Sequence, residues 1–364
     1  MKSVIRGAGY VLAHTPDMVL HNGTTQTTEH IVNPDSEYLK ELPSHIRSFE
    51  QAVAYWPNQV YIGNKTPDEL AAVAQPWCDK ECDCHERYGK FGQMMPQNEF
   101  LLLMQACDVF DLVELEAEFV AANREALAAN PVMEQSVLDR LKNGNSLEEI
   151  QRLVEEEGAE GLYHLGQLVG CVKRAHDIDA NLSAHVMHEN LVSKASSVLA
   201  LLNVIHVTGI DRNQVEYVID CAEEACGDIN QRGGGNFAKS AAEIAGLNNA
   251  SGSDCRAFCA APAHAMIEAA ALVASGTCGE GILEQELFND RFYAYVSPEN
   301  PLYERQNIRI EDIDLKDLVI LSPGNCMRDQ IIELCQARRN MPSRYSFESG
   351  SLDTLMRIVD CTSC

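Results

Sequence analysis

Basic residues and long apolar runs are scarce in this 364-residue sequence. It has 28 Lys and Arg against 54 Asp and Glu, a formal net charge of −26. Nucleic acids and anionic membranes attract basic patches, so this balance argues against both as partners and suits a basic protein partner. We find no apolar run near the ~20 residues that a membrane helix needs, and residues 1–19 lack the continuous apolar core of a signal peptide.

Cysteine, by contrast, is plentiful, with 14 residues. A chain that is 46% apolar is large enough to build a hydrophobic core, so it does not need disulfides to hold it together. We therefore expect free thiols in a reducing cytoplasm, as in an anaerobe. The length suits two domains or one large α/β unit.

The sequence is organised around Gln231–Gly276. A triple glycine is followed by a helix-like run, Asn236–Gly246, and an extended segment, Leu247–Gly252. An alanine-rich helix is then predicted over Ala260–Ser275, and Gly276 suits the left-handed position after its end.

Two cysteines, Cys255 and Cys259, come just before this predicted helix. The N–H groups and positive dipole end of a helix favour a thiolate, and they stabilise the oxyanion that forms during thioester chemistry. Cys259 is therefore the candidate nucleophile, with Cys255 as a second thiol that could protect it or take part in redox chemistry. The alternative is that both are small buried packing residues.

Long runs of this sequence resemble the beta subunits of component C of glycine reductase complexes. The resemblance covers about residues 1–276 and is carried by GNKTPDELAAV, RYGKFGQMMPQNEFLLLM, RAHDIDANLSAHVMHENLVSKASSVLALL and VEYVIDCAEEACGDINQRGGGNFAKS, continuing through Gly276. That family is in turn similar to ketoacyl synthase III and the thiolase fold. The resemblance implies a layered αβα half of a thiolase-like fold, in which Cys259, but not Cys255, has the place of the nucleophile.

The same resemblance implies a function in amino-acid fermentation. Selenoprotein A would deliver an acetyl group to a cysteine of this chain as a thioester, and phosphate, with the component C alpha subunit, would release acetyl phosphate. It implies no cofactor and no metal, and a homo- or hetero-oligomer. Two alternatives stay open: a ketoacyl synthase III-like condensing acyltransferase, and a non-catalytic assembly subunit or inactive fragment.

Substrate-binding candidates follow the predicted strand Val215–Cys221. Backbone N–H groups of Gly234 and Gly235, with Asn236, suit a phosphate cradle, or form only a tight turn. Arg232 either holds an anionic group or pairs with nearby acidic residues.

Two groups of soft ligands raise the question of a metal. Cys78, Cys82, Cys84 and His85 lie within eight residues, without the second pair of ligands of a usual zinc site, so a solvated loop is the better interpretation. His185 and His188 are three residues apart on a predicted helix; we favour hydrogen-bonding histidines over a metal site.

The remaining pattern predicts secondary structure and domains. We expect extended or loop structure over Met18–Ile31, strand over Gln59–Ile62, helix over Asn98–Asn130, two short helices within Gln135–Gly158, strand over Leu162–Cys171 and helix over Asn190–Val207. We expect a thiolase-like domain at 1–276, with a helical insertion at about 98–160, and an unmatched segment at 277–364, so that the C-terminal half is atypical or missing. Within that segment Thr277–Glu286 reads as a poor central strand and Leu315–Leu321 as a good strand. No general base is identified, since His264, five residues after Cys259, points away from it.

Overall fold

The computed structural model describes residues 3–22, 24–222, 236–257 and 260–285, with isolated stretches at 296–298, 300–303, 305, 319–321, 347–349 and 359. The chain divides into two compact units, Met1–Glu286 and Leu287–Cys364. The first is a mixed α/β unit and holds every predicted site residue.

A parallel sheet organises the first unit and comprises β6 (Val215–Ala222), β7 (Ser251–Arg256) and β8 (Glu280–Gln285). The order is β7-β6-β8, and β6 runs parallel to both neighbours. The apolar run of β6 places it between the other two, as expected for a strand covered on both faces. The predicted strand Val215–Cys221 is confirmed.

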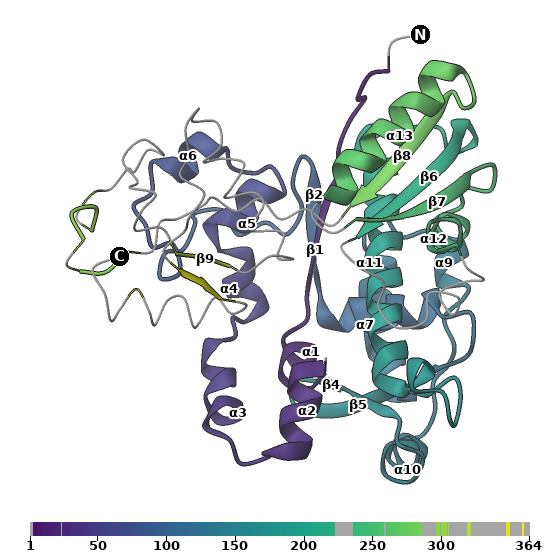
Figure 1. The fold of residues 1–364 in the computed structure, drawn as a ribbon. Helices are drawn as coiled ribbons and strands as arrows, with labels where there is room; N and C mark the ends of the chain where they lie inside the picture. The colour runs from purple at the N-terminus through teal and green to yellow at the C-terminus, as the bar shows by residue number, and fades with distance from the viewer. Residues whose placement is uncertain are drawn as a thin grey trace. The chain divides into compact units, whose positions relative to one another are not determined.

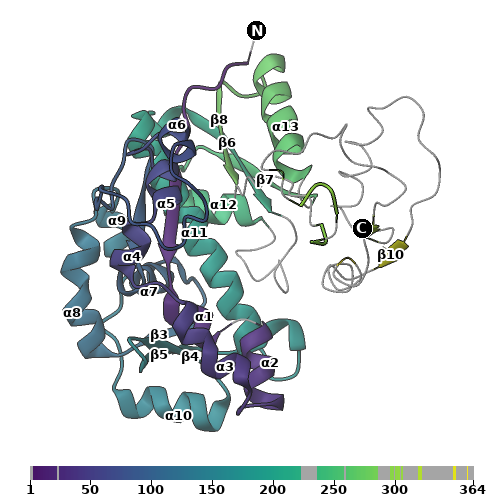
Figure 2. The same ribbon diagram turned by 90° about the vertical axis from the view of Figure 1, so that its left-hand side faces the viewer.

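Helices cover both faces of this sheet (Figures 1 and 2). On one face α13 (Ala261–Ser275) packs its buried alanines, Ala261 and Ala265, against Ile219 and Cys221. On the other lie α12 (Phe237–Ile244) and α11 (Ala184–Thr208), whose apolar side chains share the main core with Val218 of β6. Since α12 links the paired strands β6 and β7, these form a βαβ unit. Helix α13 links β7 to β8, which lies on the other side of β6.

Thr277–Glu286, predicted to be a poor central strand, contains β8 (Glu280–Gln285), which lies at an edge of the described sheet beside β6. Its ladder with β6 places Ile282 opposite Val218, in the main core. Backbone pairing and one well-placed apolar side chain therefore outweigh the glycine and glutamate content of the segment.

Two smaller sheets complete the first unit. β1 (Tyr10–His14) pairs in parallel with β2 (Gly92–Pro96). β5 (Gln167–Val172) pairs antiparallel with β3 (Val113–Leu115) and β4 (Glu160–His164), so the predicted strand Leu162–Cys171 is a hairpin. The predicted helix Asn98–Asn130 is interrupted: α7 (Gln97–Cys107) and α8 (Ala117–Ala128) flank β3, and the Asp108 carboxylate accepts the N–H groups of Leu112 and Val113 between them.

The N-terminal region is more helical than predicted. Met18–Ile31 is not a loop, since α1 (Pro16–His21) and α2 (Thr24–Val32) cover most of it. Gln59–Ile62 is not a strand, since α5 (Trp56–Tyr61) has a proline in its first turn and the buried Gln59 amide donates to Val53 O at 2.6 Å. The other short helices here are α3 (Glu37–Glu41), η1 (Leu42–His45), α4 (Phe49–Val53) and α6 (Pro67–Ala71).

The predicted helices of the acidic region are confirmed as α9 (Gln135–Leu138) and α10 (Leu147–Glu157). The predicted helix Asn190–Val207 is confirmed as part of α11. Short 3-10 turns, η2 (Ala180–Leu182) and η3 (Arg212–Gln214), flank this helix. By length and composition alone α11 could cross a membrane, which the sequence reading missed. Over half of its most apolar window, 56%, is buried inside the fold, as in the core helix of a soluble protein.

In the second unit, β9 (Val319–Leu321) pairs in parallel with β10 (Phe347–Ser349). This confirms a strand in the part of the predicted Leu315–Leu321 segment that the structure describes.

Candidate functional site

The candidate site lies where β6 and β7 end and α13 begins, because ligand sites in open α/β sheets form beyond the carboxyl ends of the strands. Helix α13 begins at Ala261 with Ala260 as its N-cap and a proline in its first turn. It ends at Gly276, whose φ of 75° is the left-handed conformation predicted for it.

Four of the predicted site residues, Cys259, Arg232, Gly234 and Gly235, lie outside the described residues. In the sequence, Cys259 directly precedes the N-cap residue Ala260. The role of Cys259 as nucleophile therefore stays a prediction. The role of the glycine segment as a phosphate cradle stays a prediction as well.

Cys255 lies in β7, half-buried, directly opposite Cys221 of β6 in the parallel ladder. Both side chains face α13 and belong to the same small apolar cluster. The Cys255 Sγ is 3.6 Å from the carbonyl oxygen of Ala261, in the first turn of α13. The second predicted thiol is therefore placed against the start of that helix.

Asn236 is the N-cap of α12. Its Oδ1 accepts the Lys239 N–H at 2.8 Å, and its Nδ2 donates to Gly252 O at 2.7 Å. Both ends of the amide are thus used within the protein, where they join the start of α12 to β7. Its binding of substrate stays a prediction.

Sequence reasoning missed a charged cluster on the opposite face of the same strand ends. The Arg256 guanidinium is 2.5 Å from the buried carboxylate of Asp220, and 4.0 Å from that of Asp254. Asp254 also accepts the N–H groups of Phe237 and Ala238, at 2.9 and 2.8 Å, at the start of α12. This cluster ties the ends of β6 and β7 to the start of α12.

A signal for this cluster does exist in the sequence. Asp-Cys occurs near the end of both strands, as Asp220-Cys221 and Asp254-Cys255, and the two pairs are in register. Because side chains alternate along a strand, the two aspartates share one face and the two cysteines the other. The repeat indicates that the two pairs lie side by side only when the pairing register of β6 and β7 is known, and the sequence does not show that register.

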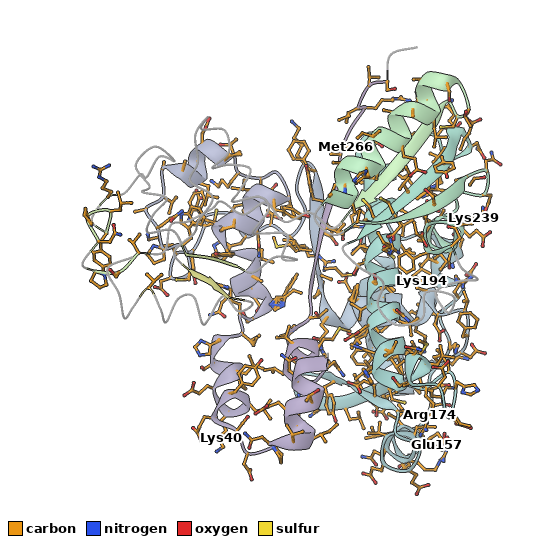
Figure 3. All side chains as sticks on the ribbon, viewed as in Figure 1. Lys40, Glu157, Arg174, Lys194, Lys239 and Met266 are labelled. Carbon is orange, nitrogen blue, oxygen red and sulfur yellow. The ribbon has the colours of Figure 1, made fainter. Side chains whose placement is uncertain are left out.

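Several other thiols are unsuited to nucleophilic chemistry. Burial raises the pKa of both Cys107 and Cys171 to about 12. Burial likewise raises the pKa of Cys82 and of Cys278. Lys194, near Cys107 in the middle of α11 (Figure 3), is itself buried, and this desolvation lowers the pKa of its amine. At neutral pH these thiols stay protonated, so they are poor nucleophiles.

Within the described part of the chain, no group of three or more His, Cys, Asp or Glu residues could hold a metal ion. The fragment with Cys78, Cys82, Cys84 and His85 is fully described, and Cys82 is buried while Cys78 is exposed. His188 is buried, and desolvation, helped by His185, lowers its pKa to about 4. His185 lies 3.2 Å from the Ser183 hydroxyl. His264 is exposed on α13.

Two hollows among the described residues lie away from this site. One, of about 590 Å³, is lined by residues around the end of α10, including Glu157 and Arg174 (Figure 3). The other, of about 490 Å³, lies between the loop after α8 and the end of α11. None of the predicted site residues lines either hollow.

Comparison with known proteins tests the resemblance that the sequence shows. The glycine/sarcosine/betaine reductase complex component C subunit beta of Peptoclostridium acidaminophilum is 59% identical to this chain over 275 residues. The matched part of the chain is similar to that subunit at a level of identity far above chance. The resemblance predicted from the sequence is therefore confirmed, and the relative is by name part of a reductase complex.

The match covers 75% of this chain and 53% of the relative, so the chain spans about half the length of the curated relative it matches. A family model described as the LysR substrate binding domain matches residues 270–360, which begin within α13. No solved structure matches the chain.

Proposed function

We propose that this chain works as a component C beta-type subunit that carries an acetyl group as a thioester on Cys259. The observation that supports this most is the position of Cys259 in the sequence, directly before the N-cap of a fifteen-residue helix at the end of a parallel strand. The first N–H groups of such a helix favour a thiolate and stabilise an oxyanion.

A thiolase-like fold is part of the proposal. A parallel sheet covered by helices on both faces, with α13 following an edge strand of the described sheet, is compatible with one αβα half of that fold. The ketoacyl synthase III-like character rests on the resemblance of the sequence to component C beta subunits, and it is part of the same proposal.

The proposed chemistry is acyl transfer. Selenoprotein A would carry the two carbons as a carboxymethyl group on selenium. The carbon–selenium bond breaks reductively, with the two electrons coming from a thiol of selenoprotein A that becomes bonded to the selenium. The acetyl group then forms a thioester with the Cys259 sulfur, and the second carboxylate oxygen leaves as hydroxide. Phosphate then attacks the thioester carbonyl, acetyl phosphate leaves, and the thiolate is restored. The component C alpha subunit would take part in the phosphate step, and Arg232 with the following glycines would bind phosphate. The complex would act in the cytoplasm.

The test is acyl labelling of the purified protein with radiolabelled acetyl phosphate, which runs the phosphate step in reverse. We expect Cys259→Ser to abolish a thioester that hydroxylamine releases, while Cys107→Ser, a change in a buried thiol with a raised pKa, leaves it intact. Label that persists in Cys259→Ser would contradict the proposal. Labelling by acetyl-CoA but not by acetyl phosphate would instead favour the condensing acyltransferase.

A further inference from the structure

Cys221 and Cys255 are lateral neighbours in the central sheet. They are direct partners in the parallel β6–β7 ladder and lie on the same face, under the first turns of α13. Neither forms a disulfide in this structure. Adjacent strands run about 4.8 Å apart, which is within the roughly 4.4–6.8 Å between Cα atoms that a disulfide spans.

The two thiols differ in access. Cys221 is in the central strand of the described sheet and only 1% exposed, whereas Cys255 is half-buried in β7. Among the described residues β7 has no further strand on its outer side. An attacking group from solvent therefore reaches Cys255 before Cys221.

We propose that Cys221 and Cys255 form a dithiol site that exchanges with disulfides. The Cys255 thiolate attacks a disulfide of a protein or small molecule, so that a mixed disulfide forms and one thiol leaves. Cys221 then attacks the Cys255 sulfur, the second thiol leaves, and a Cys221–Cys255 disulfide remains. Two electrons pass from the pair to the incoming disulfide, and the two protons end on the released thiols.

The oxidised pair should be easily reduced. Paired residues on adjacent strands hold their Cβ atoms at about the strand spacing, beyond the roughly 3.8 Å mean of disulfides, so closing the bond strains the ladder. Closure also removes the Cys255 thiol from its 3.6 Å contact with Ala261 O. Strained disulfides are the labile ones, which suits a pair that cycles rather than a structural bridge.

This site does not rest on the acyl-transfer proposal, because neither thiol is Cys259. The position of the pair against α13 nonetheless puts a redox-active group beneath the helix whose start follows Cys259.

The test is exchange of the full chain with glutathione disulfide, followed by iodoacetamide and tryptic peptide mass spectrometry. A Cys226→Ser background leaves Cys221 as the one cysteine of the tryptic peptide 213–232, while Cys255 is the one cysteine of 240–256. We expect these two peptides to become linked, and to separate on mild reduction. Cys171, opposite Gly161 and Glu114 in its own sheet, is the matched control and should stay alkylatable once the chain is denatured.

Single variants test the order of attack. Cys221→Ala should leave Cys255 as a glutathione mixed disulfide, whereas Cys255→Ser should leave Cys221 unmodified under the same exposure. Should Cys221→Ala fail to fold, the linkage in the Cys226→Ser protein decides the proposal by itself. Two fully alkylated peptides after exposure to the oxidant, or linkage of 240–256 to the Cys259 peptide instead, would overturn it.

Discussion

At the scale of single residues, the charges that hold the candidate site together are buried. Asp220 is 4% exposed and carries the negative charge that balances Arg256. A buried ion pair adds little net stability, but removing one partner leaves the other charge uncompensated in a medium of low dielectric. The strand ends around Cys255 therefore depend on both charges being present.

We predict that Asp220→Asn lowers the free energy of unfolding by about 3 kcal/mol, because it leaves Arg256 unpaired. Adding Arg256→Gln should recover part of this loss. Urea unfolding of the single and double variants measures the coupling. The exposed pair of Lys40 (Figure 3) with Glu37 is the control, and Glu37→Gln should change little. If the two single variants lose equal amounts of unfolding free energy and the double variant loses their sum, the pairing is contradicted.

His188 gives the stability a pH dependence. Burial holds its pKa at about 4 in the folded chain, against ~6.5 when unfolded. The unfolded state therefore binds a proton first, so stability is complete above about pH 6.5 and is lost as the pH falls toward about 4, by up to ~3 kcal/mol.

His188→Gln should remove this part of the pH dependence, and His185→Gln should retain it. Unfolding free energies measured from about pH 7 to about pH 4.5 give the comparison. Parallel curves for wild-type and His188→Gln would show that the ring does not stay neutral in the fold.

At the scale of elements, α13 is defined by its ends. Gly276 has a φ of 75°, and a Cβ built on it meets nothing within 4 Å. A substitution there therefore strains the backbone without a clash.

We predict that Gly276→Ala destabilises the protein by about 1 kcal/mol, through the cost of the left-handed conformation alone. Gly276→Asn should cost less, since asparagine tolerates that region better. Thermal unfolding of the two variants tests the order. A loss in Gly276→Ala of the size seen for a deleted core side chain would mean that this helix end is packed.

Elements with strong local signals could be predicted, and others could not. Thr66 and Ser146 are residues of the types that cap helices, and each accepts the N–H of the residue three positions on. β8 was missed because its pattern is acidic and glycine-rich, and only pairing with β6 makes it a strand. The Asp220–Arg256 pair was missed for the same reason, since strand register brings residues far apart in sequence together.

At the scale of the whole molecule, helix α13 exposes large apolar side chains that its packing against the sheet does not bury. Met266 (Figure 3) is 48% exposed and Ile267 67% exposed, on a helix that buries only alanines. Contiguous exposed apolar surface marks an interaction site.

We predict that the purified chain self-associates, and that Met266→Gln with Ile267→Gln shifts it toward the monomer. Sedimentation velocity over a range of concentrations measures this. Ile178→Gln, which changes an isolated side chain that is 89% exposed, is the control and should have no effect. A clean monomer at every concentration would contradict an interface on α13.

The central claim is that the start of α13 activates Cys259. The most direct measurement is pulsed iodoacetamide alkylation from about pH 5.5 to about pH 9, read for each cysteine by peptide mass spectrometry, with the other cysteines as internal controls. We predict that Cys259 reacts fastest and still reacts well below the ~8.5 pKa of an ordinary thiol. If Cys259 instead follows the profile of the exposed Cys78, the helix start does not activate it and acetyl transfer on this residue is contradicted.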